Sequence, residues 1–174
     1  MGILICGLNG SGKSTVGKLL ADRLGYLFID NEELYFPNRD SDYSYSSAAS
    51  KDEAIHLLEE KIKENRDFVF SAVRGDYGDR LISDLDYIVL IEVPREIRLQ
   101  RVYDRSFSKY GERILSGGDL FEKENEWFSR VGNRPEEYIT GWIATINCPI
   151  VRIDGTLPAE ENVDYIVLEI NKKS

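Results

Sequence analysis

One run of residues near the start of the chain has the types and spacing needed to bind phosphate. The pattern G-x-x-x-x-G-K-[ST] is matched by Gly7-Leu8-Asn9-Gly10-Ser11-Gly12-Lys13-Ser14. Glycines let the backbone turn tightly, so that its N–H groups point toward phosphate oxygens at the positive end of the helix that follows. Lys13 can reach the β- and γ-phosphates, and the Ser14 hydroxyl can bind Mg²⁺. We therefore predict that this run, together with Thr15, binds ATP with Mg²⁺.

Three arginines in the middle of the chain are spaced to face one ligand. Arg98, Arg101 and Arg105 stand at i, i+3 and i+7, which places them on one face of a helix. Guanidinium groups bind phosphate oxygens and stack on bases. We predict that Arg101 and Arg105 act in catalysis, that Arg101 also binds the nucleotide, and that Arg98 binds the substrate. The alternative is a solvated helix face that pairs with Glu96 and Asp104.

Two carboxylates and a further arginine follow the apolar runs in which strands are expected. Asp30 is predicted to bind Mg²⁺ through water and to contribute to the substrate site, although it is also well placed as a helix N-cap. Glu32 is predicted to orient or deprotonate an acceptor hydroxyl, with a solvated loop acid as the alternative. Arg74 follows the third strand, at the sheet edge where ligands bind in open α/β folds, and is predicted to bind the acceptor.

The elements that position these residues follow from the pattern of apolar side chains. An apolar strand at 3–6 directly precedes the phosphate loop, and an amphipathic helix at 13–24 directly follows it. Further apolar runs predict four more strands, at 26–29, 68–70, 87–93 and 149–153. Because apolar runs alternate with helix-period segments, we predict an α/β fold with three layers. Its five-stranded sheet would be mainly parallel, with helices on both faces.

The helices between the strands have recognisable starts. Ser50 and Glu53 form a capping box for a helix that reaches about residue 65, and Pro94 precedes a long helix. Asp119 is predicted as the N-cap of a third helix, and Trp127 on that helix is expected in the core. Further segments are a helix at 135–146, a strand or short helix at 163–170, and a polar loop at 38–50.

Length and composition restrict the class of protein. The chain has 174 residues, a length that suits one domain. Its net charge of −9 disfavours binding to nucleic acid. No apolar run reaches the ~18 residues that a membrane span needs, and the start of the chain does not resemble a signal peptide, so a cytoplasmic location without membrane contact is expected. His56, Cys6 and Cys148 lack the spacing of a zinc site.

Two other classes of nucleotide-binding protein are excluded by missing motifs. Translational GTPases need an Asn-Lys-x-Asp guanine-binding motif after a strand, and the chain has none. The run Leu115-Ser116-Gly117-Gly118-Asp119 looks like the signature of transporter ATPases. That signature should lead into a helix and an apolar strand ending in Asp-Glu, whereas the residues downstream here are polar.

The chain resembles the small P-loop kinases that include adenylate kinase and shikimate kinase. Besides the phosphate loop, residues 28–32 are similar to the F-x-D-x-D of shikimate kinases, whose acids lie near Mg²⁺ and touch the acceptor hydroxyl. Residues 93–105 look like the entry to a kinase lid with its R-x-x-x-R pair. The resemblance implies a P-loop kinase fold over 1–174, with an acceptor-side insertion at 38–66 and a mobile lid at 98–118. It also implies that the loop Asp154-Gly155-Thr156 holds adenine.

The same resemblance leaves the acceptor open. The D-G-F-P-R of adenylate kinases is replaced after the third strand by Ser71-Ala72-Val73-Arg74, and the triple glycine of shikimate kinases is absent. Residues 116–126 resemble a group of uncharacterised bacterial P-loop proteins. We predict an ATP- and Mg²⁺-dependent phosphotransferase that acts on a nucleotide, a nucleoside or a hydroxyl-bearing metabolite. The alternatives are a nucleotide-binding switch or slow NTPase acting through a protein partner and, disfavoured by the net charge, a polynucleotide 5′-hydroxyl kinase.

Overall fold

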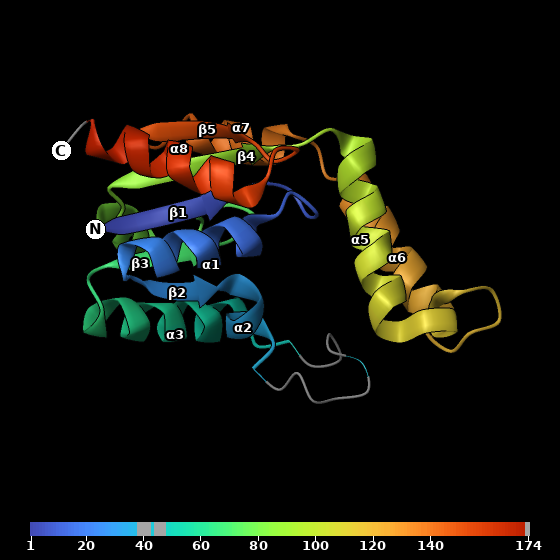
Figure 1. The fold of residues 1–174 in the computed structure, drawn as a ribbon. Helices are drawn as coiled ribbons and strands as arrows, with labels where there is room; N and C mark the ends of the chain where they lie inside the picture. Colours follow the sequence, from blue (N-terminus) through green and yellow to red (C-terminus); the bar gives the residue numbers. More distant parts are fainter. Residues whose placement is uncertain (38–42, 44–47, 173–174) are drawn as a thin grey trace.

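A parallel sheet forms the centre of the computed structural model, which describes residues 1–37, 43 and 48–172 (Figure 1). Its strands are β1 (Gly2–Cys6), β2 (Leu27–Asp30), β3 (Phe68–Ser71), β4 (Tyr87–Glu92) and β5 (Ile150–Asp154). They lie in the order β2-β3-β1-β4-β5, and all neighbouring pairs are parallel. The sheet, predicted as mainly parallel, is therefore wholly parallel in the described residues. Its strands all end at one edge, where ligands of such folds bind.

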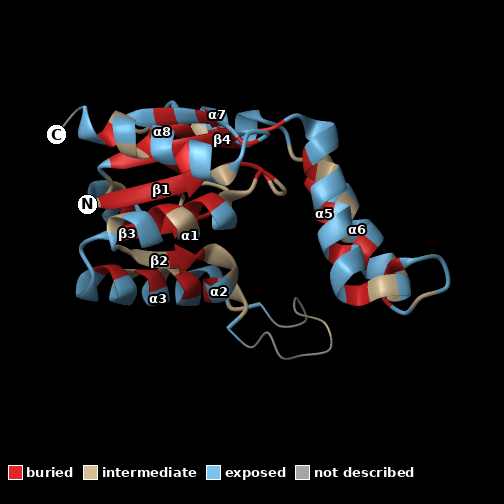
Figure 2. Ribbon diagram, in the orientation of Figure 1, coloured by how far each residue is buried: buried red, intermediate tan, exposed pale blue. Residues whose placement is uncertain are grey.

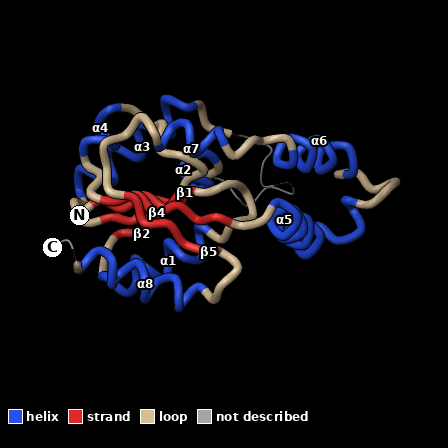
Figure 3. The backbone as a smooth tube through the Cα atoms, turned by 90° about the horizontal axis from the view of Figure 1, so that it is seen from above, coloured by secondary structure: helices blue, strands red, loops and turns tan. Residues whose placement is uncertain are grey.

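Helices cover both faces of this sheet, as the three-layer prediction required (Figure 3). One face packs against α1 (Lys13–Leu24) and α8 (Ala159–Asn171) through a core that includes Ile5, Leu20 and Ile166. The other face packs against α2 (Asn31–Tyr35), α3 (Lys51–Glu64), α4 (Asp79–Ser83) and α7 (Glu137–Ile143). The central strands are buried along their length (Figure 2). This explains why they read as continuous apolar runs.

The last helices of the chain correct two details of the sequence prediction. Residues 163–170 lie within helix α8, so the strand alternative is wrong. Helix α6 (Phe121–Gly132) begins after Leu120, and Asp119 is not its N-cap. The carboxylate of Asp119 instead accepts hydrogen bonds from Arg113 at 2.6 and 2.9 Å. Capping by Asp119 fails because a guanidinium group occupies both of its oxygens.

Helices α5 (Arg95–Tyr110) and α6 project away from the sheet as a pair (Figure 1). They are joined by the short 3₁₀ helix η1 (Gly111–Ile114). The tip of this pair has a small core of its own, built on Tyr110, Ile114 and Leu120. Tyr43, in the segment after α2, packs against this core and donates a hydrogen bond to Glu124 of α6 at 2.8 Å. Among the described residues, none of the helices combines the length and apolarity that crossing a bilayer requires.

The capping box at Ser50 generates a prediction for stability. The Ser50 hydroxyl accepts a hydrogen bond from the Glu53 amide at 3.2 Å, and the Glu53 carboxylate accepts from the Ser50 amide at 2.7 Å. We expect Ser50→Ala to lower the free energy of unfolding by about 1 kcal/mol, because the first turn of α3 loses this acceptor. Urea unfolding at pH 7 measures the loss. Ser108→Ala, at an exposed position inside α5, is the control, and an equal loss in both variants would contradict the prediction.

Candidate active site

The phosphate loop lies between β1 and α1 and packs against the first turn of α5. Gly10 has a φ of 83°, and a Cβ atom built there would lie 2.3 Å from the carbonyl oxygen of Arg98. Only glycine fits this contact. Gly12, the N-cap of α1, has no side chain to offer the first-turn amides. Their N–H groups are thus available to an anion at the positive end of the helix.

Lys13 is held close to the loop by a contact with its backbone. Its Nζ donates a hydrogen bond to the carbonyl of Leu8 at 3.3 Å. Burial lowers the pKa of Lys13 to about 8, although the nearby carboxylates of Glu32 and Asp30 act in the opposite direction. The nearby carboxylates therefore compensate only part of the cost of burying the protonated amine. A phosphate group in contact with the amine would stabilise its protonated form.

A cleft of about 850 Å³ opens at the sheet edge in front of this loop. The phosphate loop, the ends of β2 and β3, and helices α5 and α6 contribute its walls. It collects most of the residues predicted for the site: Asn9, Gly10, Gly12, Lys13, Ser14, Thr15, Asp30, Glu32, Arg74, Arg101 and Arg105. Residues far apart in the sequence thus share one solvent-accessible space of the size that holds a small molecule.

The acids at the end of β2 have different partners. Asp30 is 8% exposed, and its Oδ1 accepts a hydrogen bond from the amide of Glu32 at 2.8 Å, so it caps α2. The cap uses one carboxylate oxygen, and Asp30 also lines the cleft. The Oε1 of Glu32 accepts from Arg105 at 3.4 Å, which confirms that α5 faces this strand end.

Ser14 and Asp30 are a suitable protein share of a Mg²⁺ site. Within the described residues no group of three His, Cys, Asp or Glu side chains could hold a metal alone. Mg²⁺ commonly takes one or two protein ligands and completes its shell with water and substrate phosphates. A hydroxyl and a carboxylate on the wall of one cleft fit that pattern.

The three arginines of α5 separate in the structure. Arg101 donates to the carbonyls of Gly155 at 3.0 Å and Gly10 at 3.5 Å, so it joins the phosphate loop to the loop after β5. Arg98 is only 3% exposed and donates to the carbonyls of Val93 at 3.2 Å and Asn9 at 3.3 Å. It lies outside the large cleft. The structure does not bring Arg98 to the acceptor side, because the first turn of α5 packs against the back of the phosphate loop.

The loop after β5, predicted to hold adenine, lies directly against the phosphate loop. A Cβ atom on Gly155 would lie 2.8 Å from the carbonyl oxygen of Ser11. Asp154 accepts hydrogen bonds from the amide and hydroxyl of Thr156, at 2.8 and 2.7 Å, which fixes the turn. The described structure therefore places Arg101 and this turn beside each other, while the contact with adenine stays a prediction.

Arg74 belongs to a charged cluster on the wall of the same cleft. It donates to Asp76 at 2.9 Å, and Lys51 contacts the same carboxylate oxygen at 3.3 Å. The hydrogen bond to Asp76 raises the pKa of Arg74. Its guanidinium lies 3.9 Å from the ring centre of Tyr138. Within the described residues, the buried Arg74 Nε and Ser71 Oγ have no hydrogen-bond partner, and both residues line the cleft.

Helix α6 supplies a wall that the sequence analysis missed. Lys123, Trp127 and Arg130 line the cleft at i, i+4 and i+7, a spacing as regular as that of the arginines in α5. Trp127, predicted as a core residue, is half-buried on this wall. Arg134 follows, with its Nη1 2.8 Å from the Oδ1 of Asn9 in the phosphate loop. This spacing is the sequence signal that could have identified the wall.

The cleft is positively charged within an acidic chain. Eight lysines and arginines line it, against four aspartates and glutamates, while the whole chain carries a net charge of −9. Aromatic rings stand among these charges: Tyr35, Phe36, Tyr43, Tyr77, Trp127 and Tyr138. Such a surface attracts and binds anions, and its rings can stack on a planar group.

Comparisons with known proteins give a family match and similar folds. A family model described as AAA domain matches residues 3–126. The uncharacterized protein YqaC of Bacillus subtilis is 30% identical over 173 residues, which cover 95% of this chain and 94% of that protein. Shikimate kinase from Aquifex aeolicus has a similar structure, with a TM-score of 0.53 and 21% identity over 99% of this chain and 98% of its own. Deoxyadenosine kinase from M. mycoides gives a TM-score of 0.61 and 16% identity over 99% and 100%. The chain therefore belongs to the AAA domain family and has the P-loop kinase fold.

Proposed function

We propose that the protein is an ATP- and Mg²⁺-dependent kinase that transfers the γ-phosphoryl group to a small anionic acceptor. The observation that carries this proposal is one shared cleft. The phosphate loop, Arg74, Glu32 and Arg105 all line this cleft. Phosphoryl transfer depends mostly on positioning and on stabilisation of spread negative charge, and these groups can supply both.

The donor site would bind the nucleotide through backbone amides and charged side chains. The amides of the loop and of the first turn of α1 bind the β- and γ-phosphates, and Lys13 neutralises them. Ser14 and Asp30 would hold Mg²⁺, which would offset negative charge on the transferring phosphoryl group. Arg101 and the turn at Gly155 enclose the base side of the nucleotide.

The acceptor site would orient a hydroxyl or phosphate oxygen of the second ligand toward the γ-phosphorus of ATP. That oxygen forms the new O–P bond while the bond to the β–γ bridging oxygen breaks and ADP leaves. For a hydroxyl acceptor, Glu32 accepts the departing proton or hydrogen-bonds the O–H group. Arg105, 3.4 Å from Glu32, can stabilise the transferring group with its guanidinium.

The charge of the cleft supports an anionic acceptor with a planar part. The phosphates of the donor can be bound by Lys13, Arg101 and Arg105. The cluster at Arg74 and the wall of α6 then remain for the second ligand. The structure of the M. mycoides deoxyadenosine kinase, which has a similar fold, contains the product dCMP together with dCDP. A nucleoside monophosphate has the required ring and charge, and a hydroxy acid such as the one named in shikimate kinase has the charge without an aromatic ring.

An acceptor panel tests this proposal with matched pairs. We expect transfer of ³²P from γ-labelled ATP to anionic compounds, with kcat/KM at least about tenfold higher for dCMP than for deoxycytidine, or for shikimate than for inositol, because Arg74 can pair with the charge. Arg74→Met should remove that preference. Arg80→Met, which changes an exposed arginine outside the cleft, should keep it. If phosphate were transferred only to water, and slowly, across the whole panel, the kinase proposal would be refuted and the alternative of a nucleotide-binding switch or slow NTPase favoured.

Lys13 provides a test of the donor site. We expect Lys13→Ala to reduce nucleotide turnover at least about a hundredfold, because the transferring phosphoryl group loses its nearest cation. Lys18→Ala removes an exposed lysine of the same helix that does not line the cleft, and should behave as wild type. Circular dichroism should be unchanged in both variants. Wild-type turnover in Lys13→Ala would contradict the assignment.

The lowered pKa of Lys13 predicts how nucleotide affinity depends on pH. The free protein loses the Lys13 proton near pH 8, whereas bound phosphate raises that pKa, so binding takes up a proton above pH 8. Calorimetry should show constant affinity for Mg·ATP from pH 7 to 8 and weakening of up to about tenfold per pH unit above it. Buffers with different ionisation enthalpies should report the proton uptake. A flat profile to pH 9.5 would place Lys13 away from the phosphates.

A further inference from the structure

Two buried polar atoms on the wall of the large cleft have no hydrogen-bond partner within the described residues. They are the Oγ of Ser71, a residue only 2% exposed, and the Nε of Arg74. Buried polar groups are paired in most native structures, because an unpaired group keeps the full cost of its desolvation. Both atoms can donate a hydrogen bond, so a ligand with accepting oxygens would satisfy them.

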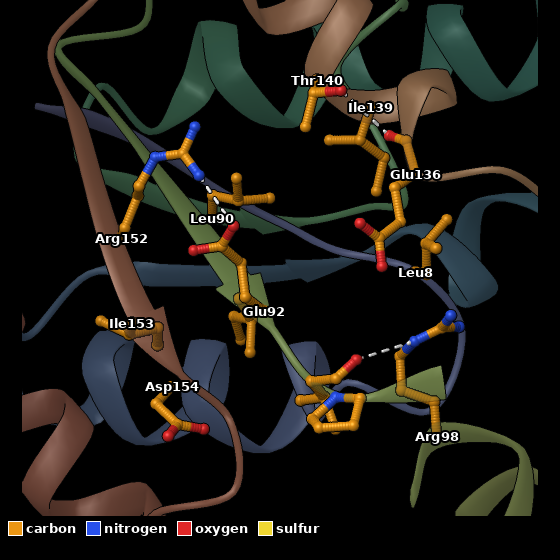
Figure 4. A pocket seen from close by; sticks show the side chains of 13 residues that line it. Leu8, Leu90, Glu92, Arg98, Glu136, Ile139, Thr140, Arg152, Ile153 and Asp154 are labelled. Carbon is orange, nitrogen blue, oxygen red and sulfur yellow. Dashed lines mark hydrogen bonds and ion pairs between the residues drawn. The ribbon is translucent and has the colours of Figure 1, made fainter. Parts of the chain in front are cut away.

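A second cavity, of about 520 Å³, lies between β4, β5 and α7 and differs in this respect (Figure 4). Arg152 and Glu92 on its wall form an ion pair of 2.7 Å, and Arg98 donates to two backbone carbonyls. None of the described residues that line this cavity has a buried polar atom without a partner. The unsatisfied donors of Ser71 and Arg74 thus mark the large cleft, not this cavity, as the place that a polar ligand would complete.

Asn31, the first residue of α2, adds a third unsatisfied donor to the large cleft. It lines the cleft, and its Oδ1 accepts a hydrogen bond from the Tyr77 hydroxyl. No described group accepts a hydrogen bond from its Nδ2. The accepting atom of the amide is therefore occupied, whereas its two N–H donors are available to a ligand.

The contact with Tyr77 fixes which end of this amide a ligand can meet. Tyr77 is 6% exposed and packs edge-on against Phe70, with ring centres 5.1 Å apart. Burial raises the pKa of Tyr77, so its hydroxyl keeps a proton to donate at neutral pH. The hydrogen bond from this immobile ring holds the Asn31 Oδ1 toward Tyr77 and leaves Nδ2 as the free end.

We propose that Asn31 binds the phosphoryl acceptor through its Nδ2 group, and that Tyr77 is the residue that positions it. The N–H groups would donate to an oxygen of the acceptor beside the one that Glu32, the next residue, would orient. This inference rests on the proposed function and restricts the acceptor to compounds with a hydroxyl, carboxylate or phosphate oxygen at that place. An ammonium group there would leave the Asn31 donors unsatisfied, because it has no lone pair to accept with.

The test measures binding on the full chain without nucleotide, with shikimate and dCMP as the two probes. In ¹H–¹⁵N spectra we expect at least one probe to give saturable shifts of both the Asn31 Nδ2 and the Arg74 Nε signals. Asn31→Ala should weaken the binding of that probe about fivefold or more, because a hydrogen bond to an anion is lost. Asn125→Ala, at an exposed position of α6 outside the cleft, should leave the affinity unchanged.

A double-mutant cycle tests whether Tyr77 acts through Asn31. Tyr77→Phe keeps the ring and removes the hydroxyl, and should weaken binding about threefold in the wild-type chain. In the Asn31→Ala chain the same change should have no further effect, because the group that it positions is gone. Tyr87→Phe removes another buried hydroxyl, which contacts the Ile170 carbonyl outside the cleft, and should not alter binding in either chain.

Three outcomes would overturn the proposal. The first is a probe that shifts the Arg74 Nε signal and leaves that of Asn31 unchanged. The second is equal weakening by Tyr77→Phe in both chains, which would assign Tyr77 a structural role only. The third is no shift of either signal up to about 20 mM of both probes, in which case the inference fails together with the proposed acceptor class. Binding with the expected pattern but without transfer of ³²P would support Asn31 as a ligand-binding residue and refute the kinase, so the two failures are distinguishable.

Discussion

The contact between the phosphate loop and the first turn of α5 determines how the site is assembled. Gly10 approaches the backbone of Arg98 so closely that no side chain fits, and the Arg98 guanidinium donates to the carbonyls of Asn9 in the loop and of Val93 just before α5. Burial lowers the pKa of Arg98, but arginine stays charged in proteins, so removal of either carbonyl partner would leave a buried charge poorly satisfied. This contact holds the base of α5 against the loop.

The other features of the cleft follow from that placement. With its base fixed, α5 directs Arg101 to the turn at Gly155 and Arg105 to Glu32. Helix α6 packs along α5 and brings a second basic wall to the same space. The chain then links back to the loop through Arg134 and Asn9. The phosphate loop is thus contacted both by the first turn of α5 and by Arg134, which follows α6.

Local features of the site were predictable from sequence, whereas features that depend on packing were not. The phosphate loop, the strands and the capping box of α3 could be predicted because each is defined by neighbouring residues. The different fates of Arg98 and Arg101 depend on which turn of α5 meets the loop, and helical spacing alone does not encode that. Trp127 looked like a core residue because burial of an aromatic ring is the more common case, whereas the structure places it on the cleft wall.

The ion pair between Arg105 and Glu32 suits a site that must change its charge partners. The side chains of Arg105 and Glu32 are 51% and 35% exposed, so the ion pair contributes at most about 1 kcal/mol to stability. A γ-phosphate brings more negative charge than one carboxylate and can therefore attract Arg105 at little cost. Under the proposed function, arrival of the donor would remove one cationic partner from Glu32. The Glu32 oxygen that had contacted Arg105 could then hydrogen-bond an acceptor hydroxyl, so donor binding would prepare the acceptor side of the cleft.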